Sequence, residues 1–310
     1  VLSEVLKTLD ILIHPFCPFT SENLYQTVFE GKQSILLDKW PQYQESLVDE
    51  EIEESFDIMK DVVSISSAAR MKGKLKRRWP LNEAQICVKK NQKVKLKSLS
   101  DLLKSQLNVE KFNIIETEED SGLEQLLELK KLGLPVKVTL ELERKKIGPK
   151  AKQHMGKLVS TFLETNPDEI IPILEKDGKY DFNIDDQKIS LDKEDFIVDF
   201  DAGDNFAVAK RDDFTVFIST LRNKEMMAKG LVKDIARRLQ TLRKERGYNP
   251  TDVLEVASIL ELDNESLEMI KGRDEELAFL VRVKKVNFEK SCKEYKEDDI
   301  DGQKIKISVE

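Results

Sequence analysis

The sequence is poor in the residues from which most metal sites and disulfide frameworks are built. It contains three cysteines among 310 residues, Cys17, Cys87 and Cys292, and they form no C-x-x-C pair. Their wide separation argues against a structural zinc site and against a set of disulfides. Few and unpaired cysteines are typical of proteins from the reducing cytosol, so we expect a cytoplasmic location.

Glycine-rich loops and histidine-based sites are missing as well. All twelve glycines stand alone, and the closest two, Gly148 and Gly156, are eight positions apart. This spacing excludes the G-x-G-x-x-G and Walker loops that usually hold the phosphates of a nucleotide. His14 and His154 have no partner at the spacing of a metal site or a catalytic triad. We therefore predict no catalytic residue, no metal site and no cofactor in this chain.

Long apolar segments are absent too. No run approaches the roughly 20 apolar residues needed to span a bilayer. The longest uncharged stretch near the start, residues 11–21, is interrupted by Pro15 and Pro18, which fits neither a signal peptide nor a membrane helix. We expect no membrane partner.

The net charge of −8 argues at first against a nucleic-acid partner. Charge acts locally, however, because the Debye length is only about 8 Å at physiological salt. A basic strip on an acidic protein therefore still attracts phosphate. The distribution of the cations, rather than the net charge, determines whether the chain can bind a nucleic acid. We expect an RNA rather than a DNA partner.

The densest basic cluster follows a predicted helix at residues 46–72. It consists of Arg70, Lys72, Lys74, Lys76, Arg77 and Arg78, and Trp79 and Pro80 follow directly. The helix dipole explains cations at the helix end, at about 0.3–1 kcal/mol per charge. It does not explain the four cations within the next five positions, whose mutual repulsion an anionic partner would relieve. We predict that this cluster binds RNA, with Trp79 either stacking on a base or packing in the core.

Two further segments are rich in cations. One contains Arg144, Lys145, Lys146, Lys150, Lys152 and Lys157, with a predicted turn at Gly148 and Pro149. The other is a predicted helix ending at Gly247, on which Lys233, Arg237 and Lys244 lie opposite an apolar stripe of Leu231, Ile235, Leu239 and Leu242; Arg238, Arg243 and Arg246 widen the basic face. Three cationic segments in an acidic chain favour a polyanionic partner. From the last segment we include Lys233, Arg237, Arg243 and Lys244 among the RNA-binding candidates.

Periodicity predicts an α+β protein in three regions. Residues 1–82 are expected to form part of a helical bundle, with helices at 1–14, after Pro18 and at 46–72. Thr20 or Ser21 would cap the second helix, and Gly31 and Gly73 would end the second and third. Residues 83–220 are expected to be mixed, with strands near 85–88, 112–115, 136–142 and 197–200 and a hairpin at 206–219. Residues 221–310 are expected to contain the basic helix and to end in a polar tail at 294–301.

Three motifs in the first region resemble the anticodon-binding bundle shared by the isoleucyl, valyl and leucyl members of the class I aminoacyl-tRNA synthetases. Residues 12–26, LIHPFCPFTSENLYQ, are similar to the family's HPF-x-PF-x-x-E-x-LYQ stretch. Residues 34–41, SILLDKWP, resemble its link ending in Trp-Pro, and residues 70–81 resemble the helix end with the K-x-R-x-PL stretch that follows. By this resemblance Leu2, Leu6, Leu9 and Ile13 would pack on helices that the sequence does not contain, so we expect them to form an exposed apolar patch.

The region after residue 230 resembles one of these three synthetases in particular. Residues 234–252, DIARRLQTLRKERGYNPTD, are similar to a signature in the C-terminal extension of isoleucyl-tRNA synthetases. Bacterial isoleucyl enzymes often end in a cysteine-bound zinc that these cysteines cannot form, so the resemblance indicates the archaeal or eukaryotic type.

The resemblance implies a part of an enzyme that binds tRNA(Ile) through the anticodon arm. The HIGH and KMSKS signatures of adenylate formation are absent, so ATP, magnesium and the ligase reaction would belong to catalytic and editing domains elsewhere in the same polypeptide. Two alternatives remain open. One is the same role in a valyl or another class I enzyme, and the other is a stand-alone RNA-binding or interaction module derived from a synthetase.

Overall fold

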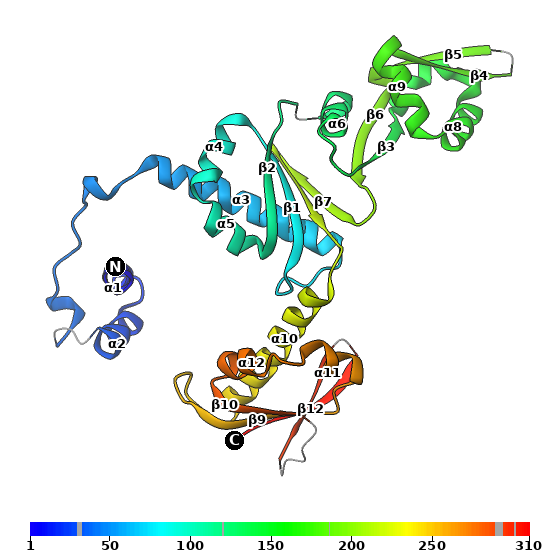
Figure 1. Ribbon diagram of the computed structural model, residues 1–310. Helices are drawn as coiled ribbons and strands as arrows, with labels where there is room; N and C mark the ends of the chain where they lie inside the picture. Colours follow the sequence, from blue (N-terminus) through cyan, green and yellow to red (C-terminus); the bar gives the residue numbers. More distant parts are fainter. Residues whose placement is uncertain (30–32, 120, 186, 289–293, 301) are drawn as a thin grey trace. The chain divides into compact units, whose positions relative to one another are not determined.

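The structure is a computed structural model that describes residues 1–29, 33–119, 121–185, 187–288, 294–300 and 302–310 (Figure 1). Helices and strands both contribute extensively, which confirms the predicted α+β class. The chain divides into two compact units, Val1–Glu51 and Ile52–Glu310. The division comes earlier than the predicted boundary at residue 82.

The first unit is helical. It contains α1 (Leu2–Ile13), α2 (Pro18–Val28) and two short 3₁₀ helices, η1 (Ile35–Leu37) and η2 (Glu45–Leu47). The predicted cap at Thr20 or Ser21 is wrong, because α2 already begins at Pro18 with Cys17 as its N-cap. Proline suits this position, since the N–H that it lacks would have no partner within the helix. The predicted stop at Gly31 lies outside the described residues.

Tyr25 is the centre of the small core of this unit. Its side chain is fully buried, and its hydroxyl donates a 2.6 Å hydrogen bond to Asp38. Asp38 also pairs with Lys7 of α1 at 2.7 Å, which connects α1 to the segment after α2. The apolar face of α1 remains uncovered: the exposed fractions of Leu2, Leu6, Leu9 and Ile13 range from 40% to 72%. The predicted exposure of these four side chains is confirmed.

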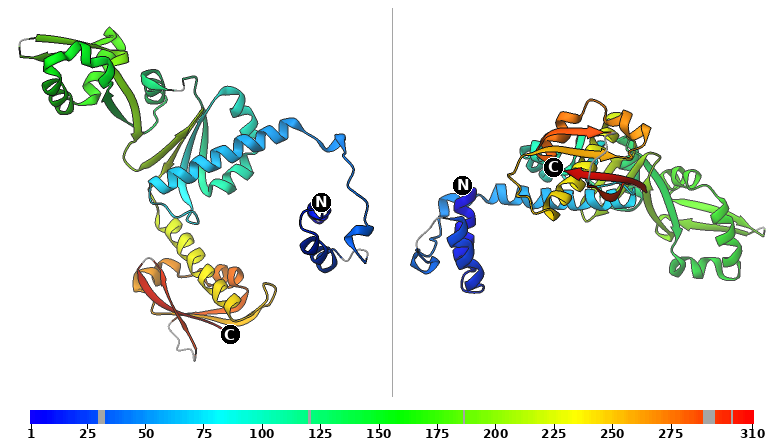
Figure 2. Two further views of the ribbon diagram at one scale, coloured as in Figure 1. Left: turned by 180° about the vertical axis from the view of Figure 1, so that it is seen from behind. Right: turned by 90° about the horizontal axis from the view of Figure 1, so that it is seen from below.

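The second unit begins with a four-stranded sheet and the long helix α3 (Figure 2). The elements are α3 (Glu50–Lys72), β1 (Leu81–Val88), α4 (Lys90–Ser98), α5 (Ser100–Leu107), β2 (Val109–Glu116), β7 (Phe206–Arg211) and β8 (Phe214–Ser219). The strand order is β2-β1-β8-β7, with β1 and β2 parallel and the other neighbours antiparallel. The predicted hairpin at 206–219 is therefore confirmed.

The spacing of apolar residues predicts Ile52, Phe56, Met59 and Val63 as the apolar face of α3. Ile52 and Phe56 are exposed in the structure, so the buried face is a different one. Ile58, Val62, Ile65 and Ala69 belong to the same apolar cluster as the inner face of the sheet. Because α3 packs on this sheet, most of it belongs to the second unit.

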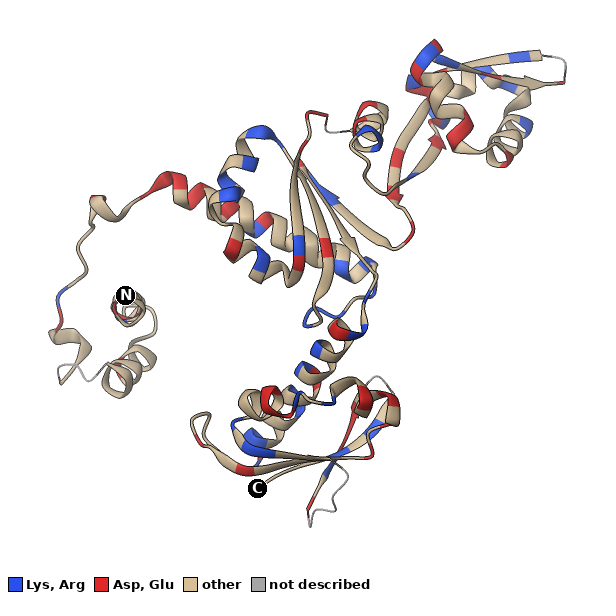
Figure 3. Cartoon of the chain, viewed as in Figure 1, with Lys and Arg blue, Asp and Glu red and all other residues tan. Residues whose placement is uncertain are grey.

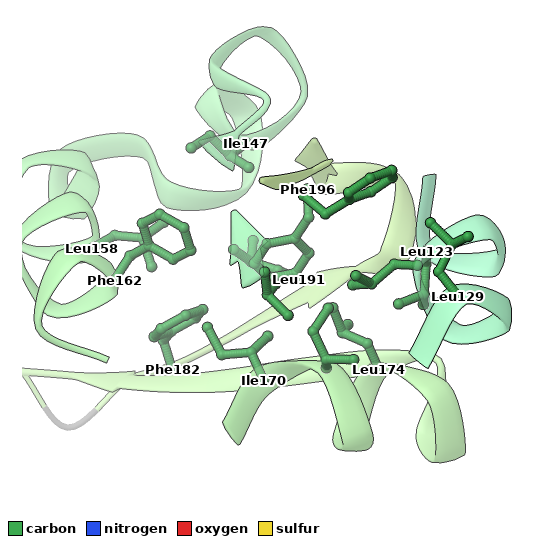
Figure 4. Packing of buried hydrophobic residues seen from close by; sticks show 14 of the residues in the cluster. Leu123, Leu129, Ile147, Leu158, Phe162, Ile170, Leu174, Phe182, Leu191 and Phe196 are labelled. Atoms are coloured by element: carbon green, nitrogen blue, oxygen red, sulfur yellow. The ribbon is translucent and has the colours of Figure 1, made fainter. Parts of the chain in front are cut away.

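The segment between β2 and β7 has its own core. Its elements are α6 (Gly122–Lys131), β3 (Val136–Leu142), α7 (Arg144–Ala151), η3 (Lys152–His154), α8 (Met155–Glu164), α9 (Pro167–Asp177), β4 (Lys179–Ile184), β5 (Gln187–Asp192), η4 (Lys193–Asp195) and β6 (Phe196–Ala202). Strand β3 pairs with β6 and β4 with β5. Phe162 of α8 contacts Phe182 and Phe196, with ring centroids 6.4 Å and 6.2 Å apart; all three are labelled among the core residues in Figure 4. The predicted turn at Gly148 and Pro149 is wrong, because both residues lie within α7.

The last segment consists of α10 and a second four-stranded sheet. Its elements are α10 (Lys224–Glu245), β9 (Leu254–Leu260), α11 (Asn264–Ile270), α12 (Asp274–Val281), β10 (Val283–Phe288), β11 (Lys296–Ile300) and β12 (Gln303–Val309). The strand order is β10-β9-β12-β11. The predicted apolar stripe of α10 packs in the core of this segment. The predicted polar tail is wrong for residues 296–300, which form β11 and pair with β12, and Asp301 lies outside the described residues.

Candidate nucleic-acid interface

The loop that carries the basic cluster starts where α3 ends. The N–H of Leu75 donates to the carbonyl of Arg70 at 2.8 Å and closes the last turn. The residue in the left-handed conformation is Lys74, with φ of 51°, rather than Gly73. Gly73 packs closely instead, since a Cβ atom there would lie 3.0 Å from the Cβ of Ala207. The predicted end of the helix is correct, but the left-handed residue that follows it is Lys74 and not the predicted glycine.

Arg70 lies inside the protein beneath this loop. Its guanidinium donates to the carbonyls of Lys76 (3.2 Å), Trp79 (3.0 Å), Leu107 (2.7 Å) and Asn108 (3.1 Å). Burial, with smaller contributions from the charges of Arg222 and Arg77, lowers the pKa of Arg70 to about 10, so the side chain remains charged at neutral pH. Because its donors are directed at backbone carbonyls, Arg70 holds the loop in place. The side chain is buried, so the predicted contact of Arg70 with RNA does not suit its position.

Asn108 fixes the loop from the end of α5. Its side-chain amide donates to the carbonyls of Arg77 (3.3 Å) and Arg78 (3.0 Å). Arg70 and Asn108 together occupy the carbonyls of the four consecutive loop residues 76–79. The loop backbone is thus held by side chains rather than left free, and Arg77 and Arg78 extend into solvent.

Trp79 packs in the interior instead of presenting a stacking surface. It is 7% exposed, and its indole N–H donates a 2.9 Å hydrogen bond to Asp234 of α10. A Cβ atom at Gly230 would lie 2.4 Å from the indole ring, so the ring rests directly on the backbone of α10. Of the two interpretations of Trp79, core packing is the one that the structure supports.

Lys76 shares the same carboxylate. Its ammonium lies 2.8 Å from Asp234 and 4.9 Å from the centroid of the Trp79 ring, and the guanidinium of Arg222 lies 5.0 Å from that centroid. Burial acts to raise the pKa of Asp234, but the hydrogen bonds from Lys76 and Trp79 and the charges of Lys76 and Arg238 outweigh it. The pKa of Asp234 therefore lies below its ordinary value. Asp234 largely neutralises Lys76, which leaves that lysine less able to hold an external phosphate.

Three cations of the cluster remain exposed on the loop itself, and we call Lys74, Arg77 and Arg78 the basic loop. Within the described part of the chain, no carboxylate lies within ion-pair distance of any of them. Arg77 also lines a pocket of about 360 Å³ together with Gln106 and residues of α3. Lys72 is exposed as well but lines a separate pocket that contains Asp199 and Asp201.

Basic residues occur along much of α10 (Figure 3), and they include both exposed and buried side chains. Arg237 and Lys244 are exposed, and Lys233 is half-buried. Arg243, by contrast, is buried. Its guanidinium donates to the carbonyls of Val281, Arg282 (2.9 Å), Asn249 (3.2 Å) and Asp252 (2.7 Å). Arg243 is therefore a structural residue, and the predicted RNA contact does not suit its position.

The basic segment at 144–157 is partly neutralised by neighbouring acids. Lys146 pairs with Glu194 at 3.4 Å, Lys150 with Asp192 at 2.7 Å, and Lys157 with Asp185 at 2.6 Å. Intramolecular pairing explains these three lysines without an external anion.

The described part of the chain holds no group of three or more His, Cys, Asp or Glu side chains placed to bind a metal ion. None of its helices is long and apolar enough to cross a membrane. Cys292 lies outside the described residues.

Comparison with known proteins gives a consistent assignment. Residues 1–86, which include the basic loop, match the family of anticodon-binding domains of tRNA ligases. The chain is 27% identical to the isoleucine–tRNA ligase of Methanothrix thermoacetophila over 99% of its length, and 28% identical to that of Clostridium kluyveri over 100%. It is 26% identical to the enzyme of Sulfolobus acidocaldarius over 92%. Relatives thus come from bacteria as well as archaea.

The chain spans only 28%, 28% and 26% of the length of these three relatives. Residues 1–86 are thus similar to anticodon-binding domains of tRNA ligases, and the chain over nearly its whole length is similar to part of isoleucine–tRNA ligases.

Proposed function

We propose that this chain is the tRNA-binding portion of an isoleucine–tRNA ligase. It holds the anticodon arm of tRNA(Ile) while catalytic and editing domains of the same polypeptide use ATP and magnesium to attach isoleucine and to remove errors. The observation that carries the proposal is the position of the basic loop. Its three unpaired cations lie within the residues that match the anticodon-binding family.

The way the loop is held supports a phosphate-binding role. Like charges placed close together repel each other, and a phosphate between them relieves that repulsion. Because Arg70 and Asn108 fix the backbone carbonyls of residues 76–79, little backbone freedom is lost when Arg77 and Arg78 bind. Ordering costs of this kind otherwise reduce affinity. The basic loop is therefore a preorganised contact for an RNA backbone.

The exposed cations of α10 extend the proposal beyond the loop. Trp79 and Lys76 both bond to Asp234 on this helix, so the loop and the first half of α10 are held together. Lys233 and Arg237 lie on either side of Asp234 in α10 and have no ion-pair partner among the described carboxylates. We propose that they contact the same RNA. The isoleucine enzyme is favoured over the valyl alternative because the relatives named above are all isoleucine–tRNA ligases.

The test is filter binding of the chain to a panel of unmodified tRNAs. The proposal predicts binding of tRNA(Ile), and weaker binding when Lys74, Arg77 and Arg78 are all replaced by glutamine. A matched control replaces Arg144, Lys145 and Lys152, three exposed cations of the 144–157 segment, and should bind as the wild type does. No binding by the wild-type chain, or an equal loss in both triple variants, would contradict the proposal.

A further inference from the structure

A pocket of about 560 Å³ lies where α10 ends and the chain turns toward β9. Its lining includes Gln240, Lys244, Tyr248, Asn249, Leu280 and Arg282. This volume lies within the range of about 300–1,000 Å³ that is usual for sites of small ligands. The basic loop is not part of its lining, so the pocket is a separate feature of the second unit.

The walls of the pocket are fixed by internal hydrogen bonds. Arg243 connects α10 to the carbonyls of Val281, Arg282, Asn249 and Asp252, which belong to the two turns beside the pocket. The side-chain amide of Gln240 donates to the carbonyl of Leu280 at 2.7 Å. The pocket is therefore preformed.

The turn after α10 places an aromatic ring in the lining. Gly247 has a φ of 80°, a left-handed conformation that glycine adopts without strain. The chain reverses there, and the N–H of Tyr248 donates to the carbonyl of Arg243 at 3.1 Å. Tyr248 is half-buried and packs against the core of this segment, so the residue is only partly covered.

The described residues of the lining combine cations, amides and a ring, and none of them carries a carboxylate. Lys244 and Arg282 are exposed, and no carboxylate of the described residues lies within ion-pair distance of either. Asn249 and Gln240 supply amide groups, and Leu280 supplies an apolar wall. An aromatic face, hydrogen-bonding amides and nearby cations are the groups that hold an unstacked base and its phosphate in RNA-binding proteins.

We infer that this pocket binds one unstacked nucleotide of an RNA, with its base on Tyr248 and its phosphate at Lys244 and Arg282. The inference rests on the proposed function in that it takes RNA as the ligand. It adds a second site, one that requires single-stranded RNA. The basic loop contacts phosphates and requires no open base, so the two sites respond differently to the form of the RNA.

The test compares two RNAs of equal length, a hairpin with an open loop and a blunt duplex. Tyr248→Leu keeps apolar volume but removes the ring, and should weaken hairpin binding about 5- to 150-fold, the range measured when a stacking ring is removed. Tyr248→Phe keeps the ring and should bind the hairpin as the wild type does. Neither substitution should change binding to the duplex.

A second variant tests the site without changing Tyr248, whose substitution could also destabilise the fold. Arg282→Gln alters an exposed side chain and should make the slope of log K against log salt for the hairpin shallower by about 0.7. Lys285→Gln, an exposed cation outside the lining, is the control and should leave the slope unchanged.

The outcomes separate this inference from the proposed function. If the basic-loop variant loses tRNA binding while Tyr248→Leu and Arg282→Gln bind the hairpin as the wild type does, the nucleotide site is refuted and the proposed function stands. An equal loss for hairpin and duplex in Tyr248→Leu also refutes it, since no base is then recognised. If the wild-type chain binds neither RNA, both proposals fall.

Discussion

The indole N–H of Trp79 donates a 2.9 Å hydrogen bond to the carboxylate of Asp234, although 155 positions separate the two residues in the sequence. The same carboxylate oxygen pairs with Lys76 at 2.8 Å. One buried acid thus connects the loop after α3 to α10. A residue of the basic cluster and its neighbouring tryptophan are used to fix the loop, and the exposed cations beside them remain available to bind RNA.

The close approach of Trp79 to α10 makes Gly230 sensitive to substitution. Gly230→Ala should lower the free energy of unfolding by about 1–3 kcal/mol, because the new methyl group would overlap the indole ring. Gly156 in α8 is the control, since a Cβ atom there meets nothing within 4 Å. Gly156→Ala should instead stabilise by about 0.4–1 kcal/mol. Urea unfolding measures both, and equal effects would refute the packing of Trp79 on α10.

Asp234 should contribute a pH-dependent part of the stability. Its pKa is lowered in the folded protein, so the carboxylate stabilises the fold above its ordinary pKa of 3.8, and this contribution is lost as pH falls through the lower folded value. Asp234→Asn removes that contribution. We expect the wild type to be more stable than the variant near neutral pH and the difference to shrink below about pH 4. A difference that stays constant between pH 7 and pH 3 would contradict this assignment.

Arg70 should be important for stability and Arg77 should not. Arg70→Met would leave the carbonyls of Lys76, Trp79, Leu107 and Asn108 without their donor, and an unsatisfied buried group costs about 1–3 kcal/mol. We therefore expect a loss of more than about 2 kcal/mol in urea unfolding. Arg77→Met changes an exposed side chain and should stay within about 0.5 kcal/mol of the wild type. Similar values for the two variants would show that Arg70 does not hold the loop.

The chain by itself should show no adenylate chemistry. Its isolated glycines provide no loop for a nucleotide triphosphate, so ATP–pyrophosphate exchange should remain at background with and without isoleucine. Exchange above background that depends on isoleucine would contradict the assignment of the reaction to other parts of the polypeptide.

Local sequence signals predicted part of this structure correctly. The helical stripe of α10 and the hairpin of β7 and β8 depend on periodicity and turn residues within a short window, and both were predicted. The buried face of α3 was predicted less well, because it is set by a sheet whose strands come later in the chain. Strand β11 was not predicted, because its sequence is mostly acidic and lacks the alternation of apolar and polar residues that indicates a strand.

The candidate site shows the same limit. Clustering in the sequence indicated where the cations gather but could not separate the exposed ones from Arg70 and Arg243. Their partners are carbonyls, which every residue carries, and Leu107 and Val281 lie 37 and 38 positions away. The hydrogen-bond partner of Trp79 lies on α10, so the burial of Trp79 could not be predicted from the neighbouring sequence either. The Asp234 to Asp252 motif did contain the acid that holds it, but only the fold brings the two together.

The central claim is that the basic loop holds RNA phosphates, and the salt dependence of tRNA binding tests it most directly. Each phosphate contact to single-stranded RNA contributes about −0.7 to the slope of log K against log salt. Replacing Lys74, Arg77 and Arg78 by glutamine should make the slope shallower by about 2, with a similar loss for every tRNA, since phosphate contacts carry no sequence information. The Arg144, Lys145 and Lys152 control should keep the wild-type slope. An unchanged slope in the basic-loop variant would contradict the account.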